Sequence, residues 1–176
     1  MTEIGQQAWY AIQVRRNHER ITATHLEDRG YETFLPLYKS RRRWSDRVKE
    51  IELPLFSGYL FCHMDPANRL AALTSPGVVR IVGIGKAPIA VEEREIDAVR
   101  AIVESKLYAE PHEFLQVGER VQIEQGPLRG LSGILLAIED QHRLVVGVTL
   151  LKRSVAVSIE QDWAIPLDRA DSRRCA

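Results

Sequence analysis

The sequence predicts an α+β protein of two small domains: an N-terminal α/β sandwich with a mixed or antiparallel sheet, followed by a small all-β, SH3-like barrel. Two observations support this expectation. Residues 1–107 alternate β-forming runs with amphipathic helical segments, whereas residues 117–168 hold only short apolar runs separated by turn residues. The pattern lapses over residues 108–116, which we expect to be a linker, and we expect a flexible tail over residues 169–176.

The first part of the N-terminal domain indicates a strand, a helix and further strands. AWYAIQV, residues 8–14, is rich in β-forming residues. The next segment predicts a helix with Asn17 as its N-cap and Gly30 just beyond its end, half-buried through Ile21 and Leu26. YETFLPLY, a basic hairpin tip and KEIELPLFSGYLFCHM follow as predicted strands, and Pro36 indicates an edge or a bulge.

Two further helices and a strand complete this domain. Asp65 followed by Pro66 predicts the start of a short helix, because a carboxylate can cap it and proline suits the first helical position. VVRIVGI is expected to be a strand. Apolar residues at helical spacing then predict a helix over residues 92–107, whose acidic first turn suits the positive end of the helix dipole.

The C-terminal domain contains a glycine-dense segment, GPLRGLSG, between two apolar runs. Such glycines serve either a phosphate-binding loop or the tight corners of a small barrel. A P-loop requires a lysine and a hydroxyl residue after its last glycine, and then a helix. Here leucine and serine follow Gly130, and the next segment is β-forming. We therefore predict barrel turns at Gly126, Pro127, Gly130 and Gly133.

The composition excludes several classes of protein. Of the 176 residues, 24 are basic, 24 are acidic and 45% are hydrophobic, which is typical of a globular chain. Cys62 and Cys175 lack metal-ligand spacing and are expected to be thiols in a reducing cytoplasm. No apolar run approaches the roughly 18 residues of a membrane span, and the first residues do not resemble a signal peptide.

No pattern of catalytic or metal-binding residues stands out. The histidines lack partners at diagnostic spacing, and FSGY is not a nucleophile elbow. We therefore expect no enzymatic activity, no metal and no cofactor. A small nucleotide enzyme, which would rest on the glycines alone, is the weakest alternative.

Two segments remain as candidates for binding. KSRRRWSDRVK, residues 39–49, gathers basic residues around a tryptophan, and it is either a phosphate-contacting patch or a solvated hairpin tip. LPLFSGYLF, residues 53–61, gathers Phe56, Tyr59 and Phe61, of which the last two share one face of a strand. This aromatic cluster is either sheet core or, if that face is exposed, a docking patch.

Motifs from residue 9 to about residue 167 follow a characteristic order: WYAIQV, FLP, LPLFSGYLF, SPGVVRIVG with APIAVEEREIDAV, and VGERVQIEQGPLRGLSGIL. In order and spacing they resemble the NusG family of transcription elongation and antitermination factors. The first four resemble its N-terminal NGN domain and the last its KOW motif. FLPLY and RRRWSDRVKEIELPLFSGYLF are most similar to the specialised paralogs, the UpxY-, LoaP- and RfaH-like antiterminators, although Ser57 stands where the family usually carries proline.

The resemblance implies a non-catalytic factor that docks on RNA polymerase. NGN domains of this family bind the clamp helices of the largest polymerase subunit and oppose pausing. The positions that match the family's docking residues are Phe56, Tyr59, Phe61, Ala11 and Gln13. An aromatic patch of this kind suits an amphipathic helical hairpin.

The resemblance also implies contact with the non-template DNA strand of the transcription bubble. The matching positions follow the first strand: Arg15, Arg16, His18 and Arg20. The basic segment adds the candidate nucleic-acid-binding residues Arg41, Arg42, Arg43 and Trp44. RfaH has a His-Thr-Thr contact to polymerase, but the matching place here reads Leu70, Ala71 and Ala72, so we do not expect that contact.

KOW domains of the family recruit a partner, which is the ribosomal protein NusE or the termination factor Rho. The matching hydrophobic tip is Leu150 and Leu151. In RfaH this domain also forms a helical hairpin, but LVVGVTLL and VAVSI are dense in β-branched residues, so we expect a constitutive β-barrel. The resemblance implies a cytoplasmic monomer that acts as an antiterminator on particular operons.

Two alternative functions stay open within this resemblance. One is a housekeeping factor that links polymerase to Rho or the ribosome, and the other is an RNA- or ribosome-binding KOW protein. The latter predicts RNA affinity that falls steeply with salt and is carried by the C-terminal domain. Residues 107–176, with 8 basic residues against 10 acidic ones, argue against it by their charge.

Overall fold

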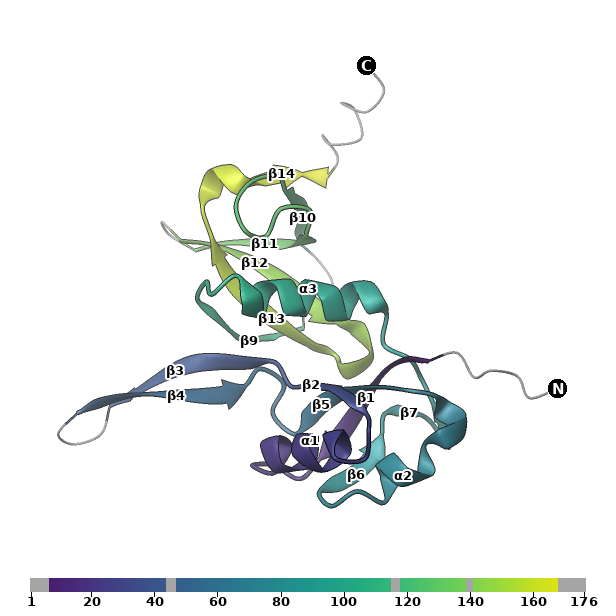
Figure 1. Cartoon of the computed structure of the whole chain (residues 1–176). Helices are drawn as coiled ribbons and strands as arrows, with labels where there is room; N and C mark the ends of the chain where they lie inside the picture. Colours follow the sequence, from purple (N-terminus) through teal and green to yellow (C-terminus); the bar gives the residue numbers. More distant parts are fainter. Residues whose placement is uncertain (1–6, 44–46, 115–117, 139–140, 168–176) are drawn as a thin grey trace.

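The computed structural model describes residues 7–43, 47–114, 118–138 and 141–167 (Figure 1). An N-terminal α/β domain and a C-terminal all-β domain follow one another along the chain, with helix α3 (Glu93–Glu104) between their sheets (Figure 1). Every strand pairing among the described residues is antiparallel. The predicted fold class is confirmed.

The N-terminal domain is built on a four-stranded sheet in the order β2-β5-β1-β6. Its elements are β1 (Ala8–Val14), α1 (Glu19–Glu27), β2 (Glu32–Phe34), β5 (Tyr59–Met64), α2 (Leu70–Leu73) and β6 (Val78–Ile81). Successive side chains of a strand point to opposite faces. Tyr10 and Ile12 therefore pack in one core with α1 and α2, whereas Trp9 and Ala11 pack in another with α3.

Helix α1 differs from the predicted helix at its start and in its buried face. It begins at Glu19, and Asn17, the predicted N-cap, instead takes a left-handed conformation with φ of 63°. Glu19, Thr22 and Leu26 are buried at the spacing of one helical stripe. Ile21 is 55% exposed, so the prediction that it is buried was wrong. The pattern misled because a glutamate and a threonine, rather than the isoleucine, fill the buried stripe.

The predicted basic hairpin is a two-stranded ribbon, β3 (Leu37–Arg43) and β4 (Val48–Pro54), which projects from the N-terminal domain (Figure 1). It separates from β2 at Leu35 and Pro36, the place where proline predicted an irregularity. The remaining elements of this domain are short: η1 (Pro66–Asn68), β7 (Gly83–Ile84) and β8 (Ala87–Pro88). Asp65 caps η1 as predicted, because its carboxylate accepts a hydrogen bond from the Ala67 amide at 2.8 Å.

The C-terminal domain is a six-stranded sheet in the order β14-β10-β11-β12-β13-β9. Its elements are β9 (Ala109–Glu113), β10 (Glu119–Ile123), β11 (Ser132–Ile138), β12 (Gln141–Val148), η2 (Thr149–Leu151), β13 (Arg153–Ile159), η3 (Gln161–Trp163) and β14 (Ala164–Pro166). The predicted linker, residues 108–116, was wrong over residues 109–113, because this segment is the edge strand β9 and pairs with β13. Residues 115–117 and the predicted tail lie outside the described residues.

The glycine-dense segment makes turns, as predicted, at Gly126 and Gly130, whose φ angles are 75° and 93°. Pro127 lies in this turn, which the Arg129 amide closes by donating to the Gly126 carbonyl at 3.2 Å. Gly133 has a different role from the predicted one. It lies within β11, where an added Cβ would come within 2.5 Å of the Val145 carbonyl oxygen, so it permits close approach of β12.

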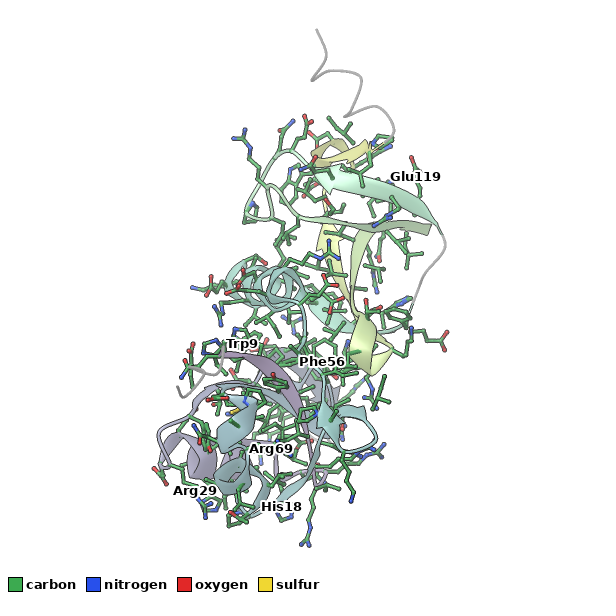
Figure 2. The ribbon with its side chains drawn as sticks, turned by 90° about the vertical axis from the view of Figure 1, so that its right-hand side faces the viewer. Trp9, His18, Arg29, Phe56, Arg69 and Glu119 are labelled. Carbon is green, nitrogen blue, oxygen red and sulfur yellow. The ribbon has the colours of Figure 1, made fainter. Side chains whose placement is uncertain are left out.

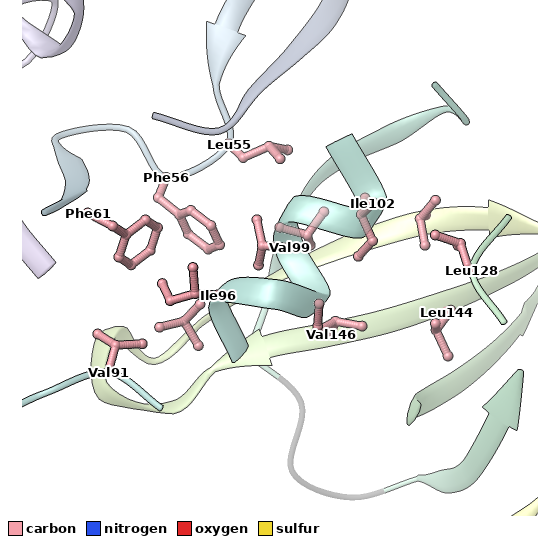
Figure 3. Packing of buried hydrophobic residues seen from close by; sticks show 14 of the residues in the cluster. Leu55, Phe56, Phe61, Val91, Ile96, Val99, Ile102, Leu128, Leu144 and Val146 are labelled. Atoms are coloured by element: carbon pink, nitrogen blue, oxygen red, sulfur yellow. The ribbon is translucent and has the colours of Figure 1, made fainter. Parts of the chain in front are cut away.

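One hydrophobic cluster joins the two domains through α3 (Figure 3). The cluster contains Ile96, Val99 and Ile102 of α3. It also contains Phe56 of the N-terminal domain and Val146 of β12 (Figure 3). Complete burial of one such side chain contributes about 1.5–3 kcal/mol to folding. The domains therefore share a core in addition to their covalent connection.

Two structural absences concern the described residues alone. No helix in that part of the chain is long and apolar enough to cross a membrane. Nor do three or more histidine, cysteine, aspartate or glutamate side chains gather there in a way that could hold a metal ion.

Candidate functional site

The predicted docking residues lie together at the face of the N-terminal sheet that packs toward α3. Across β1 and β5, Ala11 is opposite Phe61 and Gln13 is opposite Tyr59. Phe56 is 1% exposed, and Ala11 and Phe61 are 0% exposed. Gln13 and Tyr59 are half-buried. Three of the five residues therefore belong to the core, while Gln13 and Tyr59 are partly accessible to solvent.

The core beneath this surface is aromatic. Phe56 meets Phe61 edge to face, with ring centroids 5.7 Å apart, and Phe34 lies 6.1 Å from Phe61. The Arg100 guanidinium of α3 lies 5.4 Å from the Trp9 ring centroid, where a cation is attracted to the ring face. Tyr59 thus stands on a sheet whose neighbouring side chains are fixed by close packing.

The C-terminal domain contacts this surface through the β12–β13 connection. The Arg153 guanidinium lies 5.1 Å from the centroid of the Tyr59 ring, and its Nη1 donates to the Ser57 carbonyl oxygen at 3.3 Å. Thr149 donates twice to Oε1 of Glu95 on α3, from its backbone amide at 3.1 Å and from its hydroxyl at 2.6 Å. These polar contacts therefore add to the shared hydrophobic cluster in holding the C-terminal domain beside Tyr59.

The predicted partner-binding tip of the C-terminal domain belongs to the same contact. Leu150 and Leu151 lie in η2, directly after Thr149. Both leucines are half-buried and pack against the hydrophobic cluster that joins the domains. The tip is therefore partly covered within the chain itself.

The predicted nucleic-acid-binding loop lies at the end of the N-terminal domain away from the C-terminal domain, where His18 is labelled in Figure 2. Arg15, Arg16 and His18 are exposed. Arg20 is exposed as well, but it forms an ion pair with Glu52 of β4 at 2.8 Å. The loop thus offers basic side chains, and Arg20 connects α1 to the ribbon.

The two faces of the β3–β4 ribbon differ in charge. Side chains alternate between the faces. On one face Glu50 pairs with both basic neighbours, Arg41 at 3.4 Å and Lys39 at 4.0 Å. On the other face Arg42 is directly opposite Lys49, which is unfavourable for two like charges. The second face is therefore the more basic one.

Two further points complete the ribbon. Arg43 is exposed near its end, and Trp44, predicted to stack on a base, lies outside the described residues. A groove of about 1160 Å³, lined by residues that include Tyr38, Lys106 and Pro111, separates the ribbon's base from α3 and β9. Arg41 lines this groove, whereas Arg42 belongs to the opposite face of the ribbon.

Sequence reasoning missed Glu19. Its carboxylate is buried, with the residue 4% exposed, and Oε1 accepts a hydrogen bond from the Gly58 amide at 2.8 Å. It thereby joins α1 to the turn that precedes Tyr59. The available signal was its spacing from Thr22 and Leu26, which places it on the buried stripe of the helix.

The buried thiol of Cys62 is expected to react poorly as a nucleophile. Burial in the sheet, with a smaller contribution from the Glu32 carboxylate, raises its pKa to about 12. The nucleophilic thiolate is therefore a very small fraction of Cys62 at neutral pH.

Comparison with known proteins decides the family. The family model described as "Transcription termination factor nusG" matches residues 7–100, which is more than half of the chain. The chain belongs to the NusG family. It is a NusG-type transcription factor, and the predicted family is confirmed.

Relatives in this family are similar over most of their length. The transcription termination/antitermination protein NusG of Chlamydia pneumoniae is 26% identical over 171 residues, covering 89% of this chain and 93% of that protein. The protein of the same name in Campylobacter jejuni is 28% identical over 160 residues, covering 85% and 87%. A solved structure of Thermotoga maritima NusG, on the interaction of its domains, has a TM-score of 0.59 at 20% identity and covers 92% of this chain and 98% of that one.

Proposed function

We propose that this chain is an RNA polymerase-bound elongation factor, without catalysis of its own, that suppresses pausing and termination on particular operons. The observation that supports it most is the surface at Gln13 and Tyr59, which stands on a packed aromatic core. Binding energy at protein interfaces concentrates in such anchored aromatic residues. The proposed partner is the pair of clamp helices of the largest polymerase subunit, an amphipathic hairpin suited to this surface.

Docking by this route requires the C-terminal domain to move. Arg153 lies over the Tyr59 ring, and Phe56 and Phe61 are buried below it. We propose that Tyr59 and Gln13 contact polymerase once Arg153 has withdrawn. In this proposal Ala11, Phe56 and Phe61 act as the packed support that fixes their position.

The proposed nucleic-acid contacts lie elsewhere on the N-terminal domain. Arg15, Arg16 and His18 are exposed beside one another in sequence and suit the backbone and bases of the single non-template strand. We propose that Arg20 acts mainly by fixing the ribbon through Glu52. Arg41, Arg42, Arg43 and Trp44 are proposed as a second basic surface, with the face of Arg42 and Lys49 as its stronger half.

Movement of the C-terminal domain would also free its own binding tip. Leu150 and Leu151 pack against the joint core in this arrangement. We propose that they recruit NusE or Rho only after docking has separated the domains. The dense hydrogen-bonded pairing of β12 with β13 supports a C-terminal domain that stays β throughout.

Co-purification with core RNA polymerase tests the main proposal. Tyr59→Ala combined with Gln13→Ala should weaken polymerase binding by roughly tenfold or more, as expected for an interface hot spot. Tyr108→Ala is the matched control, because Tyr108 is 55% exposed outside this surface. Equal binding by wild type and the double variant would rule out this docking site.

A housekeeping factor that links polymerase to Rho or the ribosome is the second candidate. It is favoured by the relatives, which are named transcription termination/antitermination protein NusG. Transcription across a Rho-dependent terminator separates the two. The specialised factor reads through, whereas the housekeeping factor leaves or increases termination in a manner that depends on Leu150 and Leu151. An RNA- or ribosome-binding protein would instead show salt-sensitive RNA affinity in its C-terminal domain.

A further inference from the structure

The turn between β4 and β5 has a defined type. The Tyr59 amide donates to the Phe56 carbonyl at 2.9 Å, which closes a four-residue turn. Gly58, in its third position, has a φ of 81°. A positive φ at that position identifies a type II turn, which differs from type I by a flip of the central peptide. Contacts outside the turn therefore determine which of the two orientations the Ser57–Gly58 peptide adopts.

The two ends of this peptide are bonded to different parts of the chain. The Gly58 amide donates inward to the buried Glu19 carboxylate at 2.8 Å. The Ser57 carbonyl accepts from the Arg153 guanidinium at 3.3 Å, and the same guanidinium lies 5.1 Å from the Tyr59 ring centroid. The Gly58 carbonyl also accepts from the Val14 amide at 2.9 Å, which ties the turn to β1.

Glu19 favours only one of the two orientations. A carboxylate accepts hydrogen bonds and donates none. With the Gly58 amide directed inward, Glu19 is satisfied. After a flip, the Ser57 carbonyl would turn toward a buried acceptor and leave both oxygens unpaired, which is costly in a low-dielectric site. Glu19 thus keeps the Ser57 carbonyl directed outward, beside the ring of Tyr59.

An outward carbonyl next to an aromatic face suits one kind of cation. A guanidinium is planar, so it can lie over a ring and donate to the carbonyl at the same time. A lysine ammonium is a compact, strongly hydrated charge and lacks this shape. The geometry points to a guanidinium site formed by the Ser57 carbonyl and the Tyr59 ring and positioned by Glu19. Arg153 occupies it in the closed chain, and an arginine of the docking partner occupies it once the C-terminal domain withdraws. The last step rests on the proposed function.

Amide hydrogen exchange of the full chain, followed by NMR, tests the site without polymerase. Exchange at Gly58 reports its bond to Glu19, and exchange at Thr149 reports domain closure, because that amide donates to Glu95. The Ile12 amide, in the central strand β1, reports global stability. Glu19→Ala should speed exchange at Gly58 by roughly tenfold or more, as expected for loss of a hydrogen bond to a charged group, and should also speed exchange at Thr149.

Rescue distinguishes positioning from simple destabilisation. Proline at position 57 favours the same turn by fixing φ. Ser57→Pro added to Glu19→Ala should restore slow exchange at Thr149 while Gly58 stays fast. Glu19→Gln keeps the size of the side chain but can both donate and accept hydrogen bonds, so exchange at Gly58 and Thr149 should lie between wild type and Glu19→Ala. It replaces the alanine variant in this test if that variant fails to fold. Unchanged exchange in both Glu19 variants, or failure of the proline rescue with Ile12 intact, would overturn the positioning role.

The chemistry of the occupant is tested at Arg153. Arg153→Ala and Arg153→Lys should speed exchange at Thr149 to a similar extent, because lysine keeps the charge but loses the planar donor. A lysine variant that behaves as wild type would overturn the guanidinium site. Polymerase affinity forms a separate arm, in which Glu19→Ala weakens binding and the proline variant restores it. If wild type itself fails to bind polymerase, the proposed function falls, while the exchange results still decide the site in the closed chain.

Discussion

The surface at Tyr59 and the basic loop after β1 lie on the same small domain, but the first is covered by another part of the chain and the second is exposed. The surface at Tyr59 is covered by Arg153 and stands on residues that are almost fully buried. Arg15, Arg16 and His18, in contrast, are exposed. The difference follows from their chemistry, because an apolar patch in water favours unwanted association, whereas exposed charges are well solvated. An aromatic docking surface therefore benefits from a cover, and a basic one does not.

The largest expected effect concerns the support under the covered surface. Phe56→Ala should destabilise the chain by about 3–5 kcal/mol, because the change leaves a cavity in a packed core. Urea denaturation measures the change. Val48→Ala, at a site that is 64% exposed, is the control and should stay within about 0.5 kcal/mol of wild type. A destabilisation below about 1 kcal/mol for Phe56→Ala would contradict the core role described above.

The C-terminal domain, which covers the surface at Tyr59, should be displaced by a smaller change in free energy than unfolding of the core requires. Glu95→Ala deletes the acceptor of both Thr149 hydrogen bonds, each of which contributes about 1 kcal/mol or more to closure in view of the charged acceptor. We expect a larger radius of gyration in small-angle scattering and stronger polymerase binding. Glu93→Ala, in the same first turn of α3 and exposed, is the control. An unchanged scattering profile would show that the shared apolar core alone keeps the domains together.

The uncovered region should respond to charge and salt rather than to domain closure. Arg42→Gln with Lys49→Gln should make the affinity for single-stranded DNA less dependent on salt. The slope of log affinity against log salt should fall by roughly 0.7 for each phosphate that the variant no longer neutralises. Lys39→Gln with Arg41→Gln removes the same charge from the face that Glu50 already neutralises, and it should change the slope less. Equal slopes for the two double variants would show that only net charge matters.

The smallest effect is expected for the ion pair between Arg20 and Glu52. Both side chains are more than half exposed, and such pairs contribute about 0.2–1 kcal/mol. A double-mutant cycle with alanine at both positions measures this coupling in the free energy of unfolding. In DNA binding, Arg20→Ala should weaken affinity less than Arg15→Ala, since Arg20 is engaged within the domain. A larger decrease for Arg20→Ala would assign it a direct role in binding DNA.

The elements that the sequence predicted correctly are those governed by local rules. Strict alternation placed Tyr59 and Phe61 on one face with Ala11 and Gln13, and the register of β1 and β5 confirms it. The acidic start and apolar spacing predicted α3, and the glycines at 126 and 130 turn as expected. Each of these features is fixed by the backbone's period or by a conformation that few residues adopt.

The parts that could not be predicted depend on interactions between distant segments. Glu19 shares a helical stripe with Thr22 and Leu26, but its burial also depends on the hydrogen bond to Gly58, 39 residues away, which no local pattern indicates. Residues 109–113 contain proline and two glutamates, and they become a strand only because the free edge of β13 accepts them. Phe56 and Phe61 are buried in a cluster whose other members, on α3 and β12, lie far from them in the sequence, so no local pattern indicates that burial.

The strand β9 also sets the length of the tether between the domains. Because α3 ends at Glu104 and β9 begins at Ala109, only residues 105–108 join the two, and they reach at most about 14 Å when fully extended. A tether this short keeps Arg153 near Tyr59 at an effective concentration on the order of millimolar. A partner that binds at Tyr59 must compete with Arg153 at that local concentration. Its apparent affinity is therefore its intrinsic affinity multiplied by the fraction of chains that are open. If the chain has the proposed function, lengthening the tether would thus tune polymerase binding without altering any residue of the proposed docking surface.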